Sequence, residues 1–147
     1  EISEGDMINL SAPVGGFSIE NTERPQLFIG SGVGMTPLVS MFKKAASLNV
    51  PTQMIQAVVT EDERPFAQKL DSITDNYEQA QLHLHVKDKE GYLEAKELEQ
   101  YLSEQPEIYI CGGTKFLHSI INSLKELNYD MNHVHFETFI PRLSVQV

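Results

Sequence analysis

The chain has 147 residues, 41% of them hydrophobic, which is enough for one core and little more. Its formal net charge of −10 argues against nucleic acid or an anionic membrane as a partner, because both bind basic surfaces. There is no apolar run long enough to cross a bilayer and no secretory leader, so we expect a cytoplasmic protein. The single cysteine, Cys111, excludes an internal disulfide framework and a cysteine-ligated iron–sulfur cluster in this segment.

Strand and helix patterns alternate along most of the chain. Alternation of apolar and polar residues predicts a first strand over residues 5–12, and the segment 13–17 then breaks it. Further strands are predicted over residues 27–29, 53–60, 81–86, 107–111 and 133–139. Helices are predicted over residues 38–46, 65–73, 93–102 and 116–127, with a turn at 87–91. This order predicts an α/β fold: a Rossmann-like five-stranded parallel sheet with helices on both faces.

A glycine-rich segment follows the strand at 27–29 and opens a helix. It reads Gly-Ser-Gly-Val-Gly-Met-Thr-Pro from Gly30 to Pro37. Glycines let the backbone turn tightly and approach a phosphate, and a helix N-terminus adds free N–H donors and a positive dipole end. A structural turn without a ligand remains an alternative. A Walker A loop is excluded because the segment Gly30–Pro37 contains no lysine. A dehydrogenase fingerprint would need a glycine at the position of Met35.

A second motif, Cys111-Gly112-Gly113, ends the strand at 107–111 and also opens a helix. A thiol followed by two glycines leaves room for a flat ligand against the backbone. The alternative is a buried cysteine beside a flexible turn. Ligands of open parallel sheets bind beyond the carboxyl ends of the strands, so two such motifs at neighbouring strand ends favour a binding site.

Together, Gly30-x-Gly-x-Gly-x-Thr-Pro37, Cys111-Gly-Gly113 and Phe136-Glu-Thr-Phe139 resemble the ferredoxin–NADP⁺ reductase superfamily. The similarity is closest to the C-terminal reductase module of flavohaemoglobins, the nitric oxide dioxygenase type. Motifs near the N-terminus resemble the end of that family's β-barrel flavin-binding domain. The resemblance therefore implies two parts, a barrel remnant and linker over residues 1–24 and an NAD(P)-binding reductase domain over residues 25–147.

The resemblance also implies roles for individual residues. The dinucleotide would contact Gly30, Ser31, Gly32, Val33, Gly34, Met35, Thr36, Pro37, Glu61, Cys111, Gly112 and Gly113. Thr36 and Cys111 would lie at the nicotinamide, where Cys111 would position the ring without attacking it. Glu137 and Phe139 would face the flavin. For Met35, filling of the core is the simpler alternative.

The activity implied by the resemblance is hydride transfer from NAD(P)H to FAD. The flavin would be held mainly by an upstream domain, and a haem in the parent protein would receive the electrons. The partners would then be the dinucleotide and the upstream flavin-binding and globin domains, with no nucleic acid and no membrane. The chain alone should bind the dinucleotide weakly and reduce little. The alternatives are a non-catalytic interaction module with this fold and a reductase that serves an iron–sulfur partner.

Two smaller questions concern the dinucleotide and metals. The segment Thr60–Arg64 follows the strand at 53–60, where a ribose is expected, and its three carboxylates, Glu61 among them, favour NADH over NADPH. Arg64 argues the other way unless it pairs with its neighbours. Histidines occur in pairs on two strands, at 83 and 85 and at 133 and 135, but a metal site needs a further converging ligand, so we expect no metal.

Overall fold

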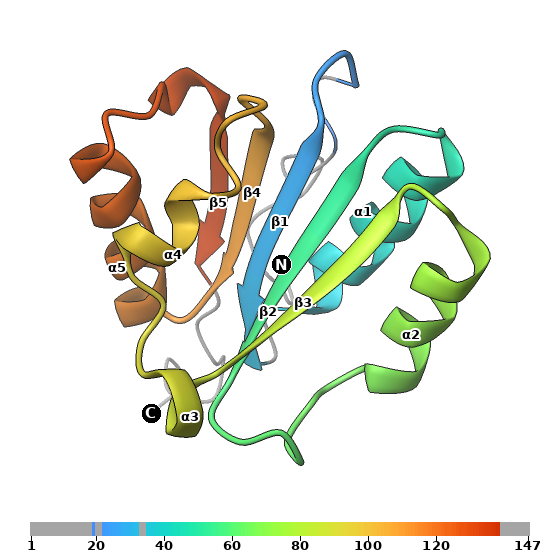
Figure 1. Ribbon diagram of the computed structural model, residues 1–147, viewed down its shortest axis with the longest axis horizontal. Coiled ribbons are helices and arrows are strands. Elements are labelled where there is room, and N and C mark those ends of the chain that lie inside the picture. Colours follow the sequence, from blue (N-terminus) through green and yellow to red (C-terminus); the bar gives the residue numbers. More distant parts are fainter. Residues whose placement is uncertain (1–18, 20–21, 33–34, 139–147) are drawn as a thin grey trace, which may run out of the picture.

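The computed structural model describes residue 19, residues 22–32 and residues 35–138. Within them, five strands form one parallel sheet in the order β3-β2-β1-β4-β5 (Figure 1). The strands are β1 (Gln26–Ser31), β2 (Thr52–Val58), β3 (Ala80–Val86), β4 (Glu107–Gly112) and β5 (Val134–Thr138). The predicted Rossmann-like parallel sheet is confirmed. The strand predicted over residues 5–12 lies outside the described residues.

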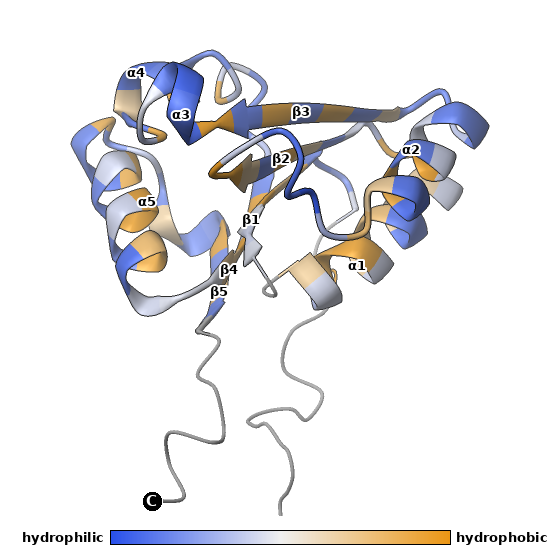
Figure 2. Cartoon of the chain, turned by 90° about the horizontal axis from the view of Figure 1, so that it is seen from below, coloured by the Kyte–Doolittle hydropathy of each residue, from blue (hydrophilic) through white to orange (hydrophobic). Residues whose placement is uncertain are grey.

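Helices cover both faces of this sheet. They are α1 (Met35–Ser47), α2 (Ala67–Asn76), α3 (Lys87–Glu90), α4 (Ala95–Glu99) and α5 (Thr114–Glu126), followed by a 3₁₀ turn, Met131–His133. Figure 2 shows α1 and α2 on one side of the strands, with α4 and α5 on the other. None of the described helices is long and apolar enough to cross a membrane.

Two apolar cores lie against the sheet because successive side chains of a strand point to opposite faces. In β1, Phe28 joins the core under α1 and α2, whereas Leu27 and Ile29 join the core under α4 and α5. Phe42 of α1 and Leu98 of α4 are fully buried on their respective sides. Both cores therefore rest on the same central strands, which hold the strand ends that carry the motifs.

The structure corrects several predicted boundaries. The helix predicted over residues 93–102 extends only from Ala95 to Glu99, where Glu94 and Glu97 form a reciprocal capping box at its start. The predicted turn at 87–91 contains one helical turn, α3, which ends at Glu90 and is followed by Gly91 with a φ of 78°. Such local stops depend on caps that the apolar period does not report.

Two further elements start later than expected. The helix predicted from residue 65 begins at Ala67, because Phe66 before it has a φ of 61° and cannot continue a helix. The strand predicted from residue 133 begins at Val134, because His133 ends the 3₁₀ turn. The end of that predicted strand, residue 139, lies outside the described part of the chain.

Candidate functional site

The predicted motifs meet at the carboxyl ends of the central strands. From β1 the chain continues through β2 to β3 in one direction along the sheet. It then adds β4 and β5 on the other side of β1, so the strand order reverses between β1 and β4. Gly30 of β1 pairs with Cys111 of β4, and Cys111 pairs with Glu137 of β5. Three residues predicted from separate motifs therefore form one row across three strands. Such a reversal of strand order is where open α/β sheets bind ligands.

The glycines after β1 have different surroundings. A Cβ on Gly30 would lie 2.7 Å from Met35 Sδ and 2.7 Å from Leu38 Cδ1, so this glycine lets α1 pack closely on the strand. Gly32 has a φ of 55°, and a Cβ there would meet nothing within 4 Å. Gly32 thus combines a backbone conformation that glycine favours with open space beside it.

The remaining residues of this segment occupy several environments. Met35 is fully buried in the core under α1, in agreement with the simpler alternative for this residue. Thr36 is exposed, and Pro37 lies in the first turn of α1, where its missing N–H is tolerated. Val33 and Gly34 lie outside the described residues.

The cysteine motif also contains one crowded and one open glycine. A Cβ on Gly112 would lie 2.8 Å from Phe116 Cδ2 and 2.9 Å from Ser31 Oγ, so β1, β4 and the start of α5 meet closely here. A Cβ on Gly113, by contrast, would meet nothing within 4 Å. The two open glycines, Gly32 and Gly113, follow neighbouring parallel strands.

The row contains two ionisable groups, Cys111 and Glu137, and the pKa of each is raised, which favours the neutral form. Cys111 is 2% exposed, and burial, with a smaller contribution from the charge of Glu137, raises the pKa of its thiol to about 12. Burial likewise raises the pKa of Glu137. A thiol with so high a pKa is a poor nucleophile, so Cys111 is suited to contact and orient a ligand. Phe139 lies outside the described residues.

A cleft of about 460 Å³ opens beside the glycine loop. Ser31 and Gly32 form one side of it, and Phe116 of α5 contributes another. Residues from the ends of β2 and β3 complete the lining, among them Val59, Pro65, Lys87 and Tyr92. A hollow of about 600 Å³ near Arg24 and Tyr129 lies at the amino ends of the strands, away from the glycine motifs. The cleft at the carboxyl ends is where a parallel sheet binds ligands.

The residues after β3 that line the cleft, Lys87, Gly91, Tyr92 and Leu93, were not predicted as site residues, because the sequence of residues 87–91 indicated only a turn. His85 Nε2 lies 2.9 Å from the Gly91 carbonyl oxygen and ties the end of β3 to that glycine. Tyr92 then projects with 69% of its surface exposed, and Lys87 Nζ lies 4.5 Å from the centre of its ring. An exposed aromatic ring can stack on a nucleobase, and a lysine beside it can pair with a phosphate group. The aromatic and basic residues just after the predicted strand were the available signal.

The expected ribose-selecting segment is held by ion pairs. Arg64 Nη2 lies 3.1 Å from Asp71 Oδ1, and its Nε lies 3.3 Å from Gln56 Oε1, so this arginine has partners in α2 and β2, outside the segment Thr60–Arg64. Lys89, from the segment after β3, forms an ion pair with Glu61. The expected carboxylate therefore has a basic partner that the sequence order did not reveal.

Metal-ligating side chains do not converge among the residues that the structure describes. No group of three or more His, Cys, Asp or Glu side chains is arranged there to hold a metal ion. His83 Nε2 lies 2.8 Å from Gln53 Oε1, and His133 and His135 both contact Glu107. The paired histidines therefore have protein partners.

The reversal of strand order, the two open glycines and the adjoining cleft are the features of an open α/β domain with a candidate ligand site at the carboxyl ends of its strands. The family model of the oxidoreductase NAD-binding domain matches residues 28–121. The chain belongs to this family, as the combined motifs predicted.

Similar proteins extend the comparison beyond that domain. Flavohemoprotein B of Dictyostelium discoideum is 28% identical in a match that covers 98% of this chain, and a Bacillus cereus flavohemoprotein is 29% identical in a match that covers 99% of this chain. The chain spans 37% and 40% of those proteins, respectively. The flavohem-like FAD/NAD-binding domain of a Vibrio cholerae nitric oxide dioxygenase superposes with a TM-score of 0.73 at 24% identity, covering 88% of this chain and 57% of that one. This likeness agrees with the fold described above.

Proposed function

We propose that this domain binds NADH and delivers its hydride to an FAD held mainly by an upstream flavin-binding domain, for onward transfer to a haem. The observation that carries the proposal is the row formed by Gly30, Cys111 and Glu137 at the reversal of strand order. The flavohemoprotein relatives, matched along nearly the whole chain, support the flavin and haem partners. A bound flavin supplies the hydride acceptor and the means to release electrons singly.

The glycine loop is the proposed pyrophosphate site. Gly32 offers open space at a positive φ, and the first turn of α1 offers backbone N–H groups that its own helix does not use. Ser31, Val33, Gly34 and Thr36 belong to the same segment, with Thr36 proposed to lie nearest the nicotinamide. Gly30 and Met35 contribute by packing α1 against β1 rather than by open space of their own.

The cysteine motif and β5 are the proposed orienting surface for the reacting rings. Open space at Gly113 leaves room for the flat nicotinamide, while the buried thiol of Cys111 lies in the row beside it. Glu137 and Phe139 are proposed to face the flavin. Hydride transfer requires the two rings to stack at near contact, so the work of this domain is orientation.

The domain boundary proposed from the sequence is retained. Residues 1–24 would be the end of the flavin-binding barrel with its linker, and residues 25–147 the NAD-binding domain, of which β1 begins at Gln26. We place the activity in the cytoplasm, which the lone cysteine fits because reducing compartments do not select for disulfide frameworks.

The pyrophosphate site is tested by calorimetric titration of this chain with NADH. Gly32→Val places a β-branched side chain at positive φ and in the proposed phosphate space, so we expect the Kd to rise at least about tenfold. Asn49→Val is the matched control, because Asn49 has a φ of 63° in the loop before β2, at the other end of the sheet. Equal Kd values for wild type and Gly32→Val would refute the phosphate site.

The dinucleotide preference is tested at the ion pair between Glu61 and Lys89. NADH is favoured if a carboxylate accepts from the ribose 2′-hydroxyl and repels a 2′-phosphate. Glu61→Arg should therefore shift the ratio of the two Kd values toward NADPH by about tenfold or more. Lys89→Gln, which leaves Glu61 without its partner, should shift the ratio toward NADH. If both variants keep the wild-type ratio, the ribose does not bind at this segment.

A further inference from the structure

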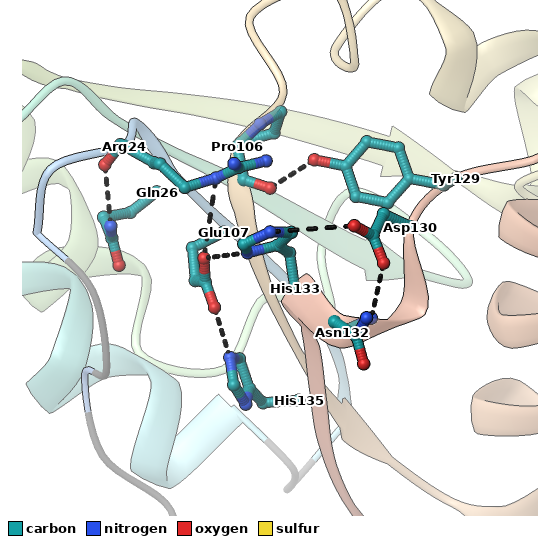
Figure 3. Close-up of polar contacts among 9 residues, drawn as sticks. All are labelled: Arg24, Gln26, Pro106, Glu107, Tyr129, Asp130, Asn132, His133 and His135. Carbon is teal, nitrogen blue, oxygen red and sulfur yellow. Dashed lines mark hydrogen bonds and ion pairs between the residues drawn. The ribbon is translucent and has the colours of Figure 1, made fainter.

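A buried carboxylate lies at the amino end of β4, opposite the cleft. Glu107 is 3% exposed, and both of its oxygens have partners (Figure 3). Oε1 lies 2.9 Å from His133 Nδ1, and Oε2 lies 2.6 Å from His135 Nε2. Since a carboxylate accepts hydrogen bonds, both rings present an N–H to it. Arg24 Nε lies 3.6 Å from Oε1, so Glu107 has a cationic partner from the segment before β1 beside its two histidine contacts.

The residues above Glu107 form parallel rows across three strands. Tyr109 pairs with Phe28 on one side and His135 on the other. The His135 ring stacks on Tyr109 at 4.9 Å, and Tyr109 stacks on Phe28 at 5.2 Å. The next row on the same face, two residues further toward the carboxyl ends, contains Cys111 and Glu137. His135 thus lies between the buried carboxylate and the proposed reaction site, on the same face of β5 as Glu137.

Register matters here because β5 is an edge strand of the described sheet and pairs with β4. A slip by one residue would turn Glu137 to the opposite face of the sheet. A slip by two residues would keep the face but remove at least one histidine from Glu107 and the His135 ring from Tyr109. The cost of a buried carboxylate without its partners opposes such slips. The observed register therefore depends on the contacts that His133 and His135 make near the amino end of β5.

We propose that His135 is a positioning residue: held between Glu107 and Tyr109, it sets the register of β5 and thereby places Glu137 beside Cys111. Its consequence for hydride transfer rests on the proposed function, whereas the placement of β5 does not. His135 lies two residues before Glu137, about 7 Å along the strand, and acts through it rather than on the dinucleotide.

The placement is tested on this chain through the reactivity of Cys111, its only cysteine and a buried one. His135→Leu loses the hydrogen bond to Glu107 and the ring stack, so iodoacetamide should alkylate Cys111 about tenfold faster or more as β5 loosens. His135→Gln keeps an N–H donor and should restore most of the protection. If the leucine variant does not fold, His135→Phe, which keeps the ring but lacks the donor, replaces it.

The matched control is His83→Leu on β3, the other edge strand. His83 also contacts a side chain of the neighbouring strand, Gln53, but lies far from Cys111 in the strand order. Its alkylation rate should stay at the wild-type value. Unchanged reactivity in both His135→Leu and His135→Phe, or an equal increase in His83→Leu, would overturn the proposal.

The functional consequence is tested in the full-length protein with its flavin domain. His135→Leu should lower kcat with NADH about tenfold while KM stays constant, because the cleft is not contacted by His135. His135→Gln should recover kcat. A rise in KM with kcat unchanged, or faster alkylation without any loss of kcat, would overturn the positioning role. Failure of NADH to bind would refute the proposed function and leave the alkylation result to judge the placement of β5.

Discussion

At the scale of single residues, Cys111 combines a reactive group with an environment that suppresses its reactivity. Burial raises the pKa of its thiol from 9.0 to about 12. Because the folded-state pKa is raised, the stability that this thiol contributes is fully present below the unfolded pKa and is lost as the pH rises through the folded value. The relevant window therefore lies between pH 9 and about 12.

Cys111→Ala tests this linkage. The variant lacks the titrating thiol. The free energy of unfolding of the wild type minus that of Cys111→Ala should therefore decrease above pH 9, by up to about 1.4 kcal/mol per pH unit. Urea denaturation of both proteins at about pH 7, 9 and 10.5 measures the difference, and tyrosine titration is common to both. A constant difference across this range would contradict the burial of the thiol.

At the scale of elements, the contact between β4, β1 and α5 depends on one missing side chain. Gly112→Ala would place a Cβ 2.8 Å from Phe116 and 2.9 Å from Ser31, so the start of α5 must move. We expect a loss of about 1–3 kcal/mol in free energy of unfolding, the usual cost of overpacking. Gly113→Ala, with nothing within 4 Å, should change that free energy by no more than about 0.5 kcal/mol. Equal effects in a denaturant titration would show that the crowding at Gly112 is relieved without cost.

At the scale of the whole molecule, the two cores share β1 and β4 and should therefore unfold together. Phe42→Ala removes a fully buried side chain under α1, and Leu98→Ala removes one under α4. Each should cost about 2–5 kcal/mol. Circular dichroism and Cys111 alkylation should report coincident transitions in urea for both variants. Separate transitions in either variant would show that the two faces of the sheet fold independently.

The segment around Gly30 and Gly32 shows which features local sequence predicts and which depend on tertiary packing. The apolar run before Gly30, the helix period after it and Pro37 in the first turn predicted the strand and the helix that the structure shows. The different surroundings of Gly30 and Gly32 could not be predicted, because they depend on where Met35 and Leu38 lie against the strand. Their roles in dinucleotide binding remain predictions.

The sequence alone predicted the parallel α/β class and the motifs at the strand ends, because these follow from periodicity and from residues close together in the chain. Membership of an NAD-binding family was predicted from the resemblance of the combined motifs to a known superfamily, and the family model confirmed it. The tertiary structure decided which distant residues meet. Glu61 and Lys89 are 28 residues apart, as are Glu107 and His135, and each pair forms only through the strand order β3-β2-β1-β4-β5. Strand order arises from the burial of apolar area over the whole sheet, which no local pattern specifies. For that reason the contacts of His135 in β5 with Glu107 and Tyr109, and the meeting of Tyr92 and Phe116 in one cleft, could be recognised only in the folded chain.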